Sequence, residues 1–417
     1  MKFLKKVLKE VFFSVYQLLL CINFLKIKYK AVTKKQLKIG FFVVYDASWG
    51  ARPLFERLIN NPKFDVKIVV CPDIARGIEN CNFVLEKTFK SLVDLYGDDK
   101  VLFCKNKETG EFLKFDNQFD LFFLAYPYNG LTYKYYKPSY LLKKFKLIVF
   151  NDYGYQSGLM IDYMLMKTPE YNCFWKFCVD NEEYKKIAKK EMYTKGRNVI
   201  VTGNCKMDLF KRYEQKKGSS RKTVMIAPHH SINKNDGWIN LSNFIRLASF
   251  FKQLPILYPS VDFIFRPHPM LLTALKKDDI WGEKKVEDYM KELLSFPNVV
   301  YSENGIYFGD FQKSDALIDD CGSFLAEYFY TKKPQCYILN KESDINKDNS
   351  QFRKEFLKNV YIAYTENDII RFLDNVVLGG NDVMKDLRYS FAENTVMYNY
   401  PKVSEAIENY LEKKFCL

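Results

Sequence analysis

The chain has 417 residues, of which 48% are hydrophobic and 27% charged. This composition excludes a wholly disordered chain, and the length exceeds what one hydrophobic core usually serves, so we expect two domains. The formal net charge is +14, but residues 1–38 contain ten lysines and one acid, Glu10. Most of the basic excess therefore belongs to the N-terminus. Because the chain also lacks RNA- or DNA-binding motifs, we predict no nucleic-acid partner.

Cysteine and histidine usage bears on compartment and on metal binding. The ten cysteines are scattered without any CxxC spacing, which is typical of reduced thiols in the cytoplasm. The chain has only three histidines, and the adjacent His229 and His230 are expected to point in different directions. A chelate from this pair is therefore not expected, and we predict no metal site.

Residues 1–36 are predicted to be a basic amphipathic segment that associates with an anionic membrane surface. No residue in the range 11–25 is charged, and lysines flank that range on both sides. About 15 apolar residues are too few to span a bilayer as a helix, whereas a narrow polar stripe on an apolar helix suits the membrane interface. A helix packed on its own protein remains open. So does a signal peptide, although no small-residue cleavage site follows.

From residue 37 onward, apolar runs alternate with stretches of helical period, which predicts parallel βαβ construction. The predicted fold class is α/β, with two tandem Rossmann-like domains. In the first half the expected strands are 38–45, 66–71, 121–126, 147–151 and 199–203, and the expected helices are 53–60, 82–96, 138–144 and 182–192. In the second half the expected strands are 223–227, 261–266, 298–301, 316–319, 335–339 and 360–364, and the expected helices are 241–254, 286–296 and 324–330.

These elements define the predicted domains. An acceptor domain covers 37–210, and a nucleotide-donor domain covers 223–391. The lysine-rich stretch 211–222 has no apolar period and is predicted to be a linker. Residues 392–417 are predicted to be a C-terminal helix. By analogy with two-Rossmann glycosyltransferases, we expect this helix to pack back on the N-terminal domain.

A histidine between two prolines follows one strand of the second domain, in the sequence Phe265-Arg266-Pro267-His268-Pro269. Open α/β sheets bind ligands beyond the carboxyl ends of their strands, and the prolines restrict the backbone so that the imidazole is presented. An isolated histidine is more often an ordinary turn residue. Here the arginine, the strand end and the rigid turn favour a phosphate site that includes Arg266 and His268.

A second strand end carries the sequence Asp320-Cys321-Gly322-Ser323 before the predicted helix 324–330. Gly322 allows close approach, Ser323 stands at the expected N-cap, and N–H groups at a helix start can bind an anion. An ordinary capped turn with a solvated Asp320 is the alternative, because strand–Gly–helix turns are common. Because this turn occurs together with His268 at another strand end of the same domain, we predict that it forms a phosphate site.

A third strand end carries Ala227-Pro228-His229-His230-Ser231. For His229 and His230, a phosphate-binding or acceptor-positioning role and simple loop structure both remain open.

Four segments in order along the second half resemble the CDP-glycerol glycerophosphotransferases, which build teichoic-acid-like and capsular polymers. Residues 201–208, VTGNCKMD, resemble the family segment V-x-G-x-P-R-x-D, and residues 226–228 resemble its Y-A-P-T-W strand end. Residues 267–269 resemble its H-P motif. Residues 315–334 resemble S-D-x-L-I-T-D-Y-S-S, followed by D and K-R-P.

This resemblance implies a membrane-associated enzyme with a GT-B-like fold. It implies that His268 contacts the donor diphosphate. It also places Asp320, Gly322, Ser323 and Glu327 at donor-site positions.

The chain departs from the family in the predicted acceptor domain. The family's W-H-G motif, whose histidine is its base, has no histidine here, and the matching strand end is Phe150-Asn151-Asp152-Tyr153-Gly154. Asp152 is the candidate base, although a loop carboxylate of ordinary pKa is weakly basic at neutral pH. Gly50, Tyr153 and Gly154 are predicted to line the acceptor side, as are His229 and His230.

The resemblance implies a transferase that moves a polyol phosphate, such as glycerol phosphate from CDP-glycerol, onto a polysaccharide or glycolipid acceptor and releases CMP. The nucleotide-linked donor is a substrate, and no cofactor is expected. We expect a peripheral protein on the cytoplasmic face of the bacterial inner membrane. Two alternatives remain open: a nucleotide-sugar glycosyltransferase of capsule or lipooligosaccharide synthesis, and a non-catalytic membrane-tethered scaffold.

Overall fold

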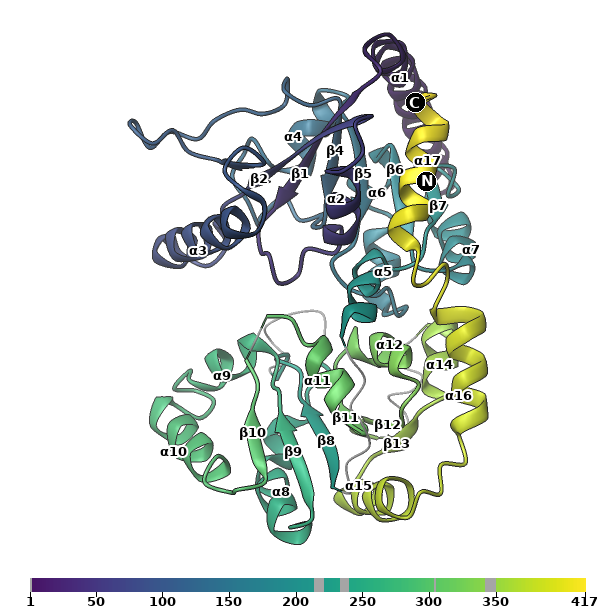
Figure 1. Ribbon diagram of the computed structural model, residues 1–417. Helices are drawn as coiled ribbons and strands as arrows, with labels where there is room; N and C mark the ends of the chain where they lie inside the picture. Colours follow the sequence, from purple (N-terminus) through teal and green to yellow (C-terminus); the bar gives the residue numbers. More distant parts are fainter. Residues whose placement is uncertain (1, 214–220, 233–239, 304, 342–349) are drawn as a thin grey trace. The chain divides into compact units, whose positions relative to one another are not determined.

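The computed structural model describes residues 2–213, 221–232, 240–303, 305–341 and 350–417 (Figure 1). The chain forms two compact units. The first unit contains residues 1–154, 163–209 and 398–417, and the second contains 155–162 and 210–397. Each unit is built on one parallel sheet, which confirms the predicted α/β class with two Rossmann-like domains.

The sheet of the first unit has seven strands in the order β3-β2-β1-β4-β5-β6-β7. The strand order reverses between β1 and β4, the position at which doubly wound sheets open a ligand crevice at their carboxyl ends. The strands are β1 (Leu37–Val43), β2 (Phe64–Val70), β3 (Val101–Phe103), β4 (Leu121–Leu124), β5 (Leu147–Asn151), β6 (Lys176–Val179) and β7 (Val199–Val201).

Helices precede, connect or follow these strands. They are α1 (Lys2–Lys34), α2 (Arg52–Leu58), α3 (Ile78–Tyr96), α4 (Pro138–Lys143), α5 (Met160–Leu165), α6 (Pro169–Cys173), α7 (Glu182–Glu191) and α17 (Val403–Phe415). A 3-10 helix, η1 (Cys205–Arg212), follows β7. The strands β4 and β5 are buried along their whole length, as expected for strands covered by helices on both faces of a parallel sheet.

The sheet of the second unit has six strands in the order β10-β9-β8-β11-β12-β13, with its reversal between β8 and β11. The strands are β8 (Lys222–Ala227), β9 (Val261–Phe265), β10 (Val299–Tyr301), β11 (Ala316–Asp319), β12 (Gln335–Ile338) and β13 (Tyr361–Ala363). Its helices are α8 (Phe244–Leu257), α9 (Pro269–Leu275), α10 (Glu283–Leu293), α11 (Phe308–Lys313), α12 (Phe324–Glu327), α14 (Gln351–Leu357), α15 (Glu366–Arg371) and α16 (Lys385–Phe391). Three further segments are the 3-10 helix η2 (Tyr328–Thr331) and the π-helices η3 (Phe372–Leu378) and η4 (Ala392–Val396).

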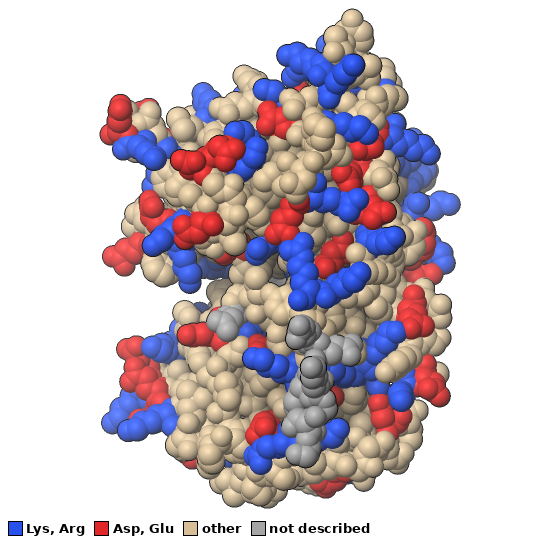
Figure 2. Space-filling view, viewed as in Figure 1, with Lys and Arg blue, Asp and Glu red and all other residues tan. Residues whose placement is uncertain are grey.

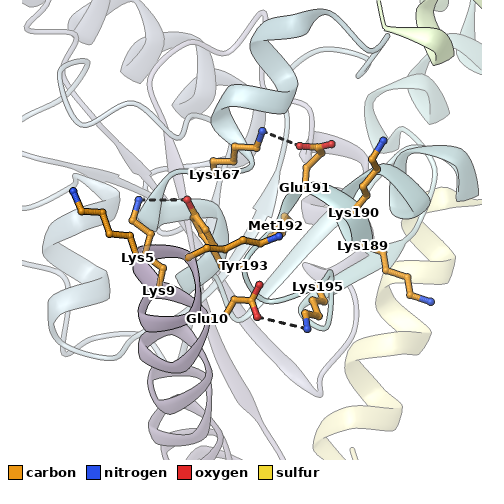
Figure 3. Close-up of a pocket in the computed structure, with 11 residues that line it drawn as sticks. Lys5, Lys9, Glu10, Lys167, Lys189, Lys190, Glu191, Met192, Tyr193 and Lys195 are labelled. Atoms are coloured by element: carbon orange, nitrogen blue, oxygen red, sulfur yellow. Dashed lines mark hydrogen bonds and ion pairs between the residues drawn. The ribbon is translucent and has the colours of Figure 1, made fainter. Parts of the chain in front are cut away.

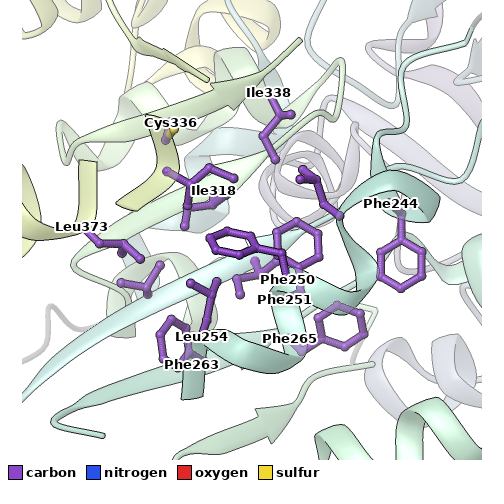
Figure 4. Packing of buried hydrophobic residues seen from close by; sticks show 14 of the residues in the cluster. Phe244, Phe250, Phe251, Leu254, Phe263, Phe265, Ile318, Cys336, Ile338 and Leu373 are labelled. Carbon is purple, nitrogen blue, oxygen red and sulfur yellow. The ribbon is translucent and has the colours of Figure 1, made fainter. Parts of the chain in front are cut away.

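The core of the second unit lies between its sheet and the helices around α8 (Figure 4). Phe250 and Leu254 of α8 pack toward the strand residues Phe263 and Ile318, and all four are buried. Because packing fixes β8, β9 and β11 side by side, the residues that follow these strands emerge at one edge of the sheet.

The last helix belongs to the first unit. Figure 1 shows α17 beside α1, and Phe415 meets Phe24 edge-on with ring centroids 5.3 Å apart. The Asp208 carboxylate accepts the backbone N–H groups of Val403 at 3.1 Å and Ser404 at 2.7 Å. These are two of the N–H groups that a helix start leaves without an intrahelical partner, so Asp208 fixes the beginning of α17.

The observed units differ in extent from the predicted 37–210 and 223–391 domains. The segment 155–162 belongs to the second unit, and α1 belongs to the first. Residues 392–417 do not form one helix, because η4 ends at Val396 and α17 begins at Val403. Most of the predicted 211–222 linker, residues 214–220, lies outside the described residues.

Gly203 gives a test of how α17 is held. Its φ is +89°, and a Cβ at this position would lie 2.1 Å from the carbonyl oxygen of Tyr398, the first residue of the segment that leads into α17. We expect Gly203→Ala to lower the free energy of unfolding by about 2–4 kcal/mol through backbone strain and this clash. Urea unfolding measures the change. Gly130→Ala is the control, since nothing lies within 4 Å of its added carbon. Equal stability of the two variants would contradict the close approach.

Candidate functional site

All three histidines of the chain meet at the carboxyl edge of the second sheet. His229 and His230 follow β8, and His268 follows β9. The ring centroid of His268 lies 4.1 Å from that of His230 and 5.3 Å from that of His229. The two adjacent rings are also close, with centroids 4.2 Å apart. The expectation that His229 and His230 diverge is therefore wrong. We call these three residues the histidine cluster.

One ring nitrogen from each of the three lies within 4.8 Å of the others, which is close enough for a shared metal ion. The local hydrogen bonds favour a different ligand. Nδ1 of His268 accepts the backbone N–H of Met270 at 3.1 Å, and Nδ1 of His229 accepts that of Ser231 at 3.2 Å. A neutral imidazole that accepts at Nδ1 carries its proton on Nε2. These two rings therefore offer N–H donors, which suit an anion better than a cation.

Burial and the neighbouring imidazoles keep His229 neutral. Burial, His230 and His268 together lower the pKa of His229 to about 2, with a further contribution from Arg353. The His229 ring is thus a neutral hydrogen-bond donor, and an anionic ligand beside it would accept its N–H and oppose the lowering of its pKa.

Asp320 at the end of β11 fixes the loop that carries two of these histidines. Its carboxylate is 1% exposed and accepts the backbone N–H of His229 at 2.6 Å and that of Asn243 at 2.5 Å. Burial raises the pKa of Asp320 to about 7, against the opposing effect of these hydrogen bonds. Asp320 therefore anchors the loop after β8 and is not a solvated turn residue.

The turn at Gly322 is backed by a buried arginine. A Cβ on Gly322 would lie 3.0 Å from Cδ1 of Leu159, so the glycine permits this close approach. The Gly322 carbonyl accepts the Ser157 hydroxyl at 2.9 Å, and Nη1 of Arg353 donates to the same hydroxyl at 2.7 Å. Arg353 is 1% exposed, and it forms no ion pair with a carboxylate in the part of the chain that is described. Among the described residues, Arg353 thus supplies a buried positive charge behind the turn.

Arg266 is directed elsewhere. Its Nη1 donates to the Ser302 hydroxyl at 2.6 Å and pairs with the Asp310 carboxylate at 2.9 Å. Burial lowers the pKa of Arg266, while Asp310 opposes that effect. Arg266 therefore ties β9 to α11, and its predicted contact with phosphate stays a prediction.

Ser323 and Glu327 also have structural partners. Ser323 lies at the N-cap of α12, but its side chain makes no capping hydrogen bond, and α12 is four residues long before η2 begins. The Glu327 carboxylate accepts the backbone N–H of Tyr155 at 3.2 Å and the hydroxyl of Tyr307. Their donor-binding roles therefore stay predictions.

The predicted acceptor residues are divided between the units: His229 and His230 lie in the second, whereas Gly50, Asp152, Tyr153 and Gly154 lie in the first, in the loops that follow β1 and β5. Gly50 approaches the loop after β5 so closely that a Cβ would lie 2.7 Å from the carbonyl oxygen of Asp152. The Asp152 carboxylate accepts the backbone N–H of Gly154 at 3.5 Å, and Tyr153 stacks on Tyr126 with centroids 4.9 Å apart. These four predicted residues of the first unit therefore come together, and the role of Asp152 as a base stays a prediction.

Sequence patterns missed several residues of both strand-end regions. In the second unit these are Asn243, Ser157 and Arg353, none of which follows a strand. In the first unit, the Ser48 hydroxyl bonds to that of Tyr126 at 2.5 Å, and Arg76 bonds to Asp73 at 2.7 Å. Asp73 follows the predicted strand 66–71 and Tyr126 is the last residue of the predicted strand 121–126, so the rule that ligands bind at strand ends was a usable signal for them.

No family model matches the chain, and no curated protein matches it. Solved structures of similar fold include the wall teichoic acid polymerase TagF, with 15% identity over 99% of this chain and 97% of that chain, at a TM-score of 0.58. UDP-GlcNAc 2-epimerase from Neisseria meningitidis, bound to UDP-GlcNAc, has 14% identity over 90% of this chain and 99% of that chain, at 0.57.

The S. aureus MnaA structure with UDP has 13% identity over 90% of this chain and 96% of that chain, at a TM-score of 0.53. At such identities the likeness establishes the fold. It confirms the GT-B-like two-domain architecture and the predicted similarity to a teichoic acid polymerase at the level of fold.

The three histidines make an NMR titration simple to interpret. Because burial and its neighbours lower the pKa of His229 to about 2, its ring signal is expected to stay constant from about pH 8 to about pH 5, whereas an ordinary histidine titrates near pH 6.5. The His229→Gln variant assigns the signal. Three signals that all titrate near pH 6.5 would contradict the burial of this ring among the others.

Asp320→Asn tests the anchor at the end of β11. The new amide can accept only one of the two backbone N–H groups and opposes its own N–H to the other, so we expect a loss of about 1–3 kcal/mol in unfolding free energy. Asp386→Asn is the matched control at an exposed site, expected to change stability by less than about 0.5 kcal/mol. Chemical denaturation compares the two. An unfolding free energy equal to that of the wild type in Asp320→Asn would show that the carboxylate does not anchor the loop.

Proposed function

We propose that the chain is a transferase that uses a nucleotide-linked donor, and that the second unit holds the donor diphosphate at the histidine cluster. The observation that carries this proposal is the convergence of His229, His230 and His268 at the carboxyl ends of β8 and β9. This edge lies beside the reversal of strand order between β8 and β11, where doubly wound sheets bind nucleotides.

The local charge supports an anionic ligand. Two of the rings offer Nε2–H donors, and Arg353 adds a buried positive charge behind the Gly322 turn. Fixed donors in a partly buried site stabilise charge without reorganising, which is the largest contribution that many enzymes make to a transition state. A diphosphate fits both the number and the polarity of these groups.

In the reaction that we propose, an acceptor hydroxyl attacks the phosphorus of the polyol phosphate in CDP-glycerol or a similar donor. The new P–O bond forms as the bond between the two phosphates breaks, CMP leaves with the electron pair, and the acceptor gives up its proton. His268 would stabilise the charge that develops on the leaving phosphate. Asp152 is proposed as the proton acceptor, since it is the carboxylate at the strand end where the resemblance places the base.

The proposed acceptor is a polysaccharide or glycolipid of teichoic-acid or capsule type. The likeness to TagF supports this choice. A nucleotide-sugar glycosyltransferase is the second candidate, favoured by the UDP and UDP-GlcNAc complexes among the structures of similar fold. Under either candidate the nucleotide-linked donor is a substrate, and we propose no cofactor or metal.

We also propose a peripheral location on the cytoplasmic face of the bacterial inner membrane. The expectation that the N-terminal segment is too short to span a bilayer is wrong, because the helix Leu4–Lys34 is long and apolar enough, by length and composition, to cross a membrane. However, hydrogen bonds from Tyr16 to Leu142 at 2.8 Å and from Gln17 to Asn172 at 2.7 Å join α1 to the rest of the first unit. A spanning helix would lose them, so a helix lying on the membrane surface fits better.

A donor screen tests the reaction. Purified protein is incubated with CDP-glycerol, CDP-ribitol, UDP-GlcNAc and GDP-mannose in the presence of acceptor, and the released nucleotide is identified. CMP release supports polyol-phosphate transfer, and UDP or GDP release supports the glycosyltransferase. If no donor binds or reacts, the non-catalytic scaffold becomes the better account.

His268→Ala tests the site itself. Loss of one donor to a charged phosphate is expected to weaken CDP-glycerol binding by about 10- to 100-fold in calorimetry. Met270→Leu is the matched control, because it preserves the backbone N–H that His268 accepts. Unchanged donor binding in His268→Ala would remove the histidine cluster from the proposed site.

A further inference from the structure

A lysine-rich hollow lies in the first unit, where the start of α1 meets the end of α7 (Figure 3). Its volume is 460 Å³. Seven lysines line it, against two glutamates. The lining residues are Lys5, Lys6, Lys9, Glu10, Lys167, Lys189, Lys190, Glu191, Met192, Tyr193 and Lys195. We call this feature the lysine hollow.

Three of the seven lysines have partners inside the hollow, as the dashed lines in Figure 3 show. Lys167 pairs with Glu191 at 2.8 Å, Lys195 pairs with Glu10 at 3.6 Å, and Lys9 donates to the Tyr193 hydroxyl at 3.3 Å. The other four form no ion pair with any described residue and are exposed: Lys5, Lys6, Lys189 and Lys190. Since both glutamates are already paired, the hollow presents a net positive charge that invites an anion.

An apolar groove continues from the lysine hollow along α1. It has a volume of 520 Å³ and shares Glu10, Tyr193 and Lys195 with the hollow. Its remaining lining residues are Val7, Val11, Ser14, Val15, Leu18 and Arg197. A positive hollow joined to an apolar groove matches a molecule with an anionic head and a hydrocarbon tail.

The outer face of α1 extends this apolar surface along the helix. Large apolar side chains recur every three or four residues and are all exposed: Leu4, Leu8, Val11, Val15, Leu18, Ile22, Leu25, Tyr29 and Val32. The opposite face is packed on the first unit, where Phe13 and Leu20 are buried and Phe24 stacks on Trp175 with centroids 5.3 Å apart. The helix is therefore held rigidly with its apolar stripe facing outward.

The charges beside this stripe favour a membrane over a second copy of the chain. A coiled-coil partner helix would bring opposite charges to the flanking positions. Here those positions hold Lys5, Lys26 and Lys28, with no acid among them, so two copies would repel each other. Lysines beside an apolar stripe suit anionic headgroups above hydrocarbon.

We propose that the lysine hollow binds the phosphate of an anionic membrane lipid, with one acyl chain lying in the groove beside Val11 and Leu18. This inference rests on the membrane location proposed above and names the site and the lipid class. It uses residues of the first unit and is independent of the donor chemistry of the second.

Vesicle flotation of the full chain tests the proposal. Wild-type protein is expected to float with vesicles of phosphatidylcholine and phosphatidylglycerol, and not with phosphatidylcholine alone. Each lysine near an anionic surface contributes roughly fivefold in affinity. Replacing Lys5, Lys6, Lys189 and Lys190 by glutamine is therefore expected to weaken binding by roughly 600-fold. Val11→Ser with Leu18→Ser is expected to weaken binding as well, while preserving its dependence on salt.

The matched control removes the same charge elsewhere, by replacing the exposed Lys90, Lys107, Lys284 and Lys291 with glutamine. Equal binding by the two fourfold variants would overturn the site. So would equal flotation with neutral vesicles, or release of the protein from vesicles by millimolar inorganic phosphate. A concentration-dependent dimer, broken by Val11→Ser with Leu18→Ser, would assign the stripe to self-association instead.

The fourfold hollow variant should keep wild-type thermal stability and wild-type binding of soluble donor. Those two measurements separate a failed lipid site from a misfolded protein and from a failure of the proposed transfer reaction.

Discussion

The carboxylate of Asp320 lies at the end of β11 and accepts the N–H groups of His229 and Asn243, so both the loop after β8 and the start of α8 are fixed to the neighbouring strand. The backbone N–H of His268 donates to the Pro228 carbonyl at 2.9 Å, which joins the loop after β9 to the same assembly. Three strand ends are thus joined by hydrogen bonds that backbone N–H groups donate, two to the Asp320 carboxylate and one to the Pro228 carbonyl. The imidazole rings converge because of this locking, and the preorganisation that we assign to the donor site depends on it.

Much of the fold followed from the sequence, because long apolar strands in a parallel sheet leave a strong pattern. The strand β5 was predicted with its observed bounds, whereas β3 and β6 were not predicted. The candidate site was harder to predict from the sequence than the fold. The strand-end rule identified His268 and Asp320, but the direction of a side chain depends on partners that are distant in sequence. Arg266 turns to Asp310, which lies 44 residues further on, and no local signal marked Arg353. The prediction that His229 and His230 point in different directions was wrong for the same reason, because Asp320 accepts the His229 N–H and so fixes the conformation of their loop.

Basic residues are mixed with acidic ones over one face of the molecule, but they are in excess along α1. Figure 2 shows basic and acidic side chains interspersed over the visible face, without one continuous basic area. The excess of lysine along α1 is different, because it borders apolar side chains on the outer face of that helix. Aromatic residues on the inner face of α1 pack against the first unit, and this packing keeps the outer face of the helix exposed. Phe13 stacks on Tyr193 with centroids 5.5 Å apart, which fixes the helix against the loop that completes the lysine hollow.

The return of the chain end to the first unit has a consequence for synthesis on the ribosome. Glu408 of α17 pairs with Arg57 and accepts a hydrogen bond from the side-chain amide of Asn61 at 2.8 Å, so the first unit is complete only when α17 has been translated. Residues 210–397 must be made first, which takes roughly 10–40 s at bacterial or slower elongation rates. During that interval Phe24 and Trp175 lack Phe415, the aromatic residue of α17 that packs against both. A stop codon that removes α17 would therefore damage the N-terminal half of the protein, and chaperones that recognise exposed apolar surface would meet the nascent chain there.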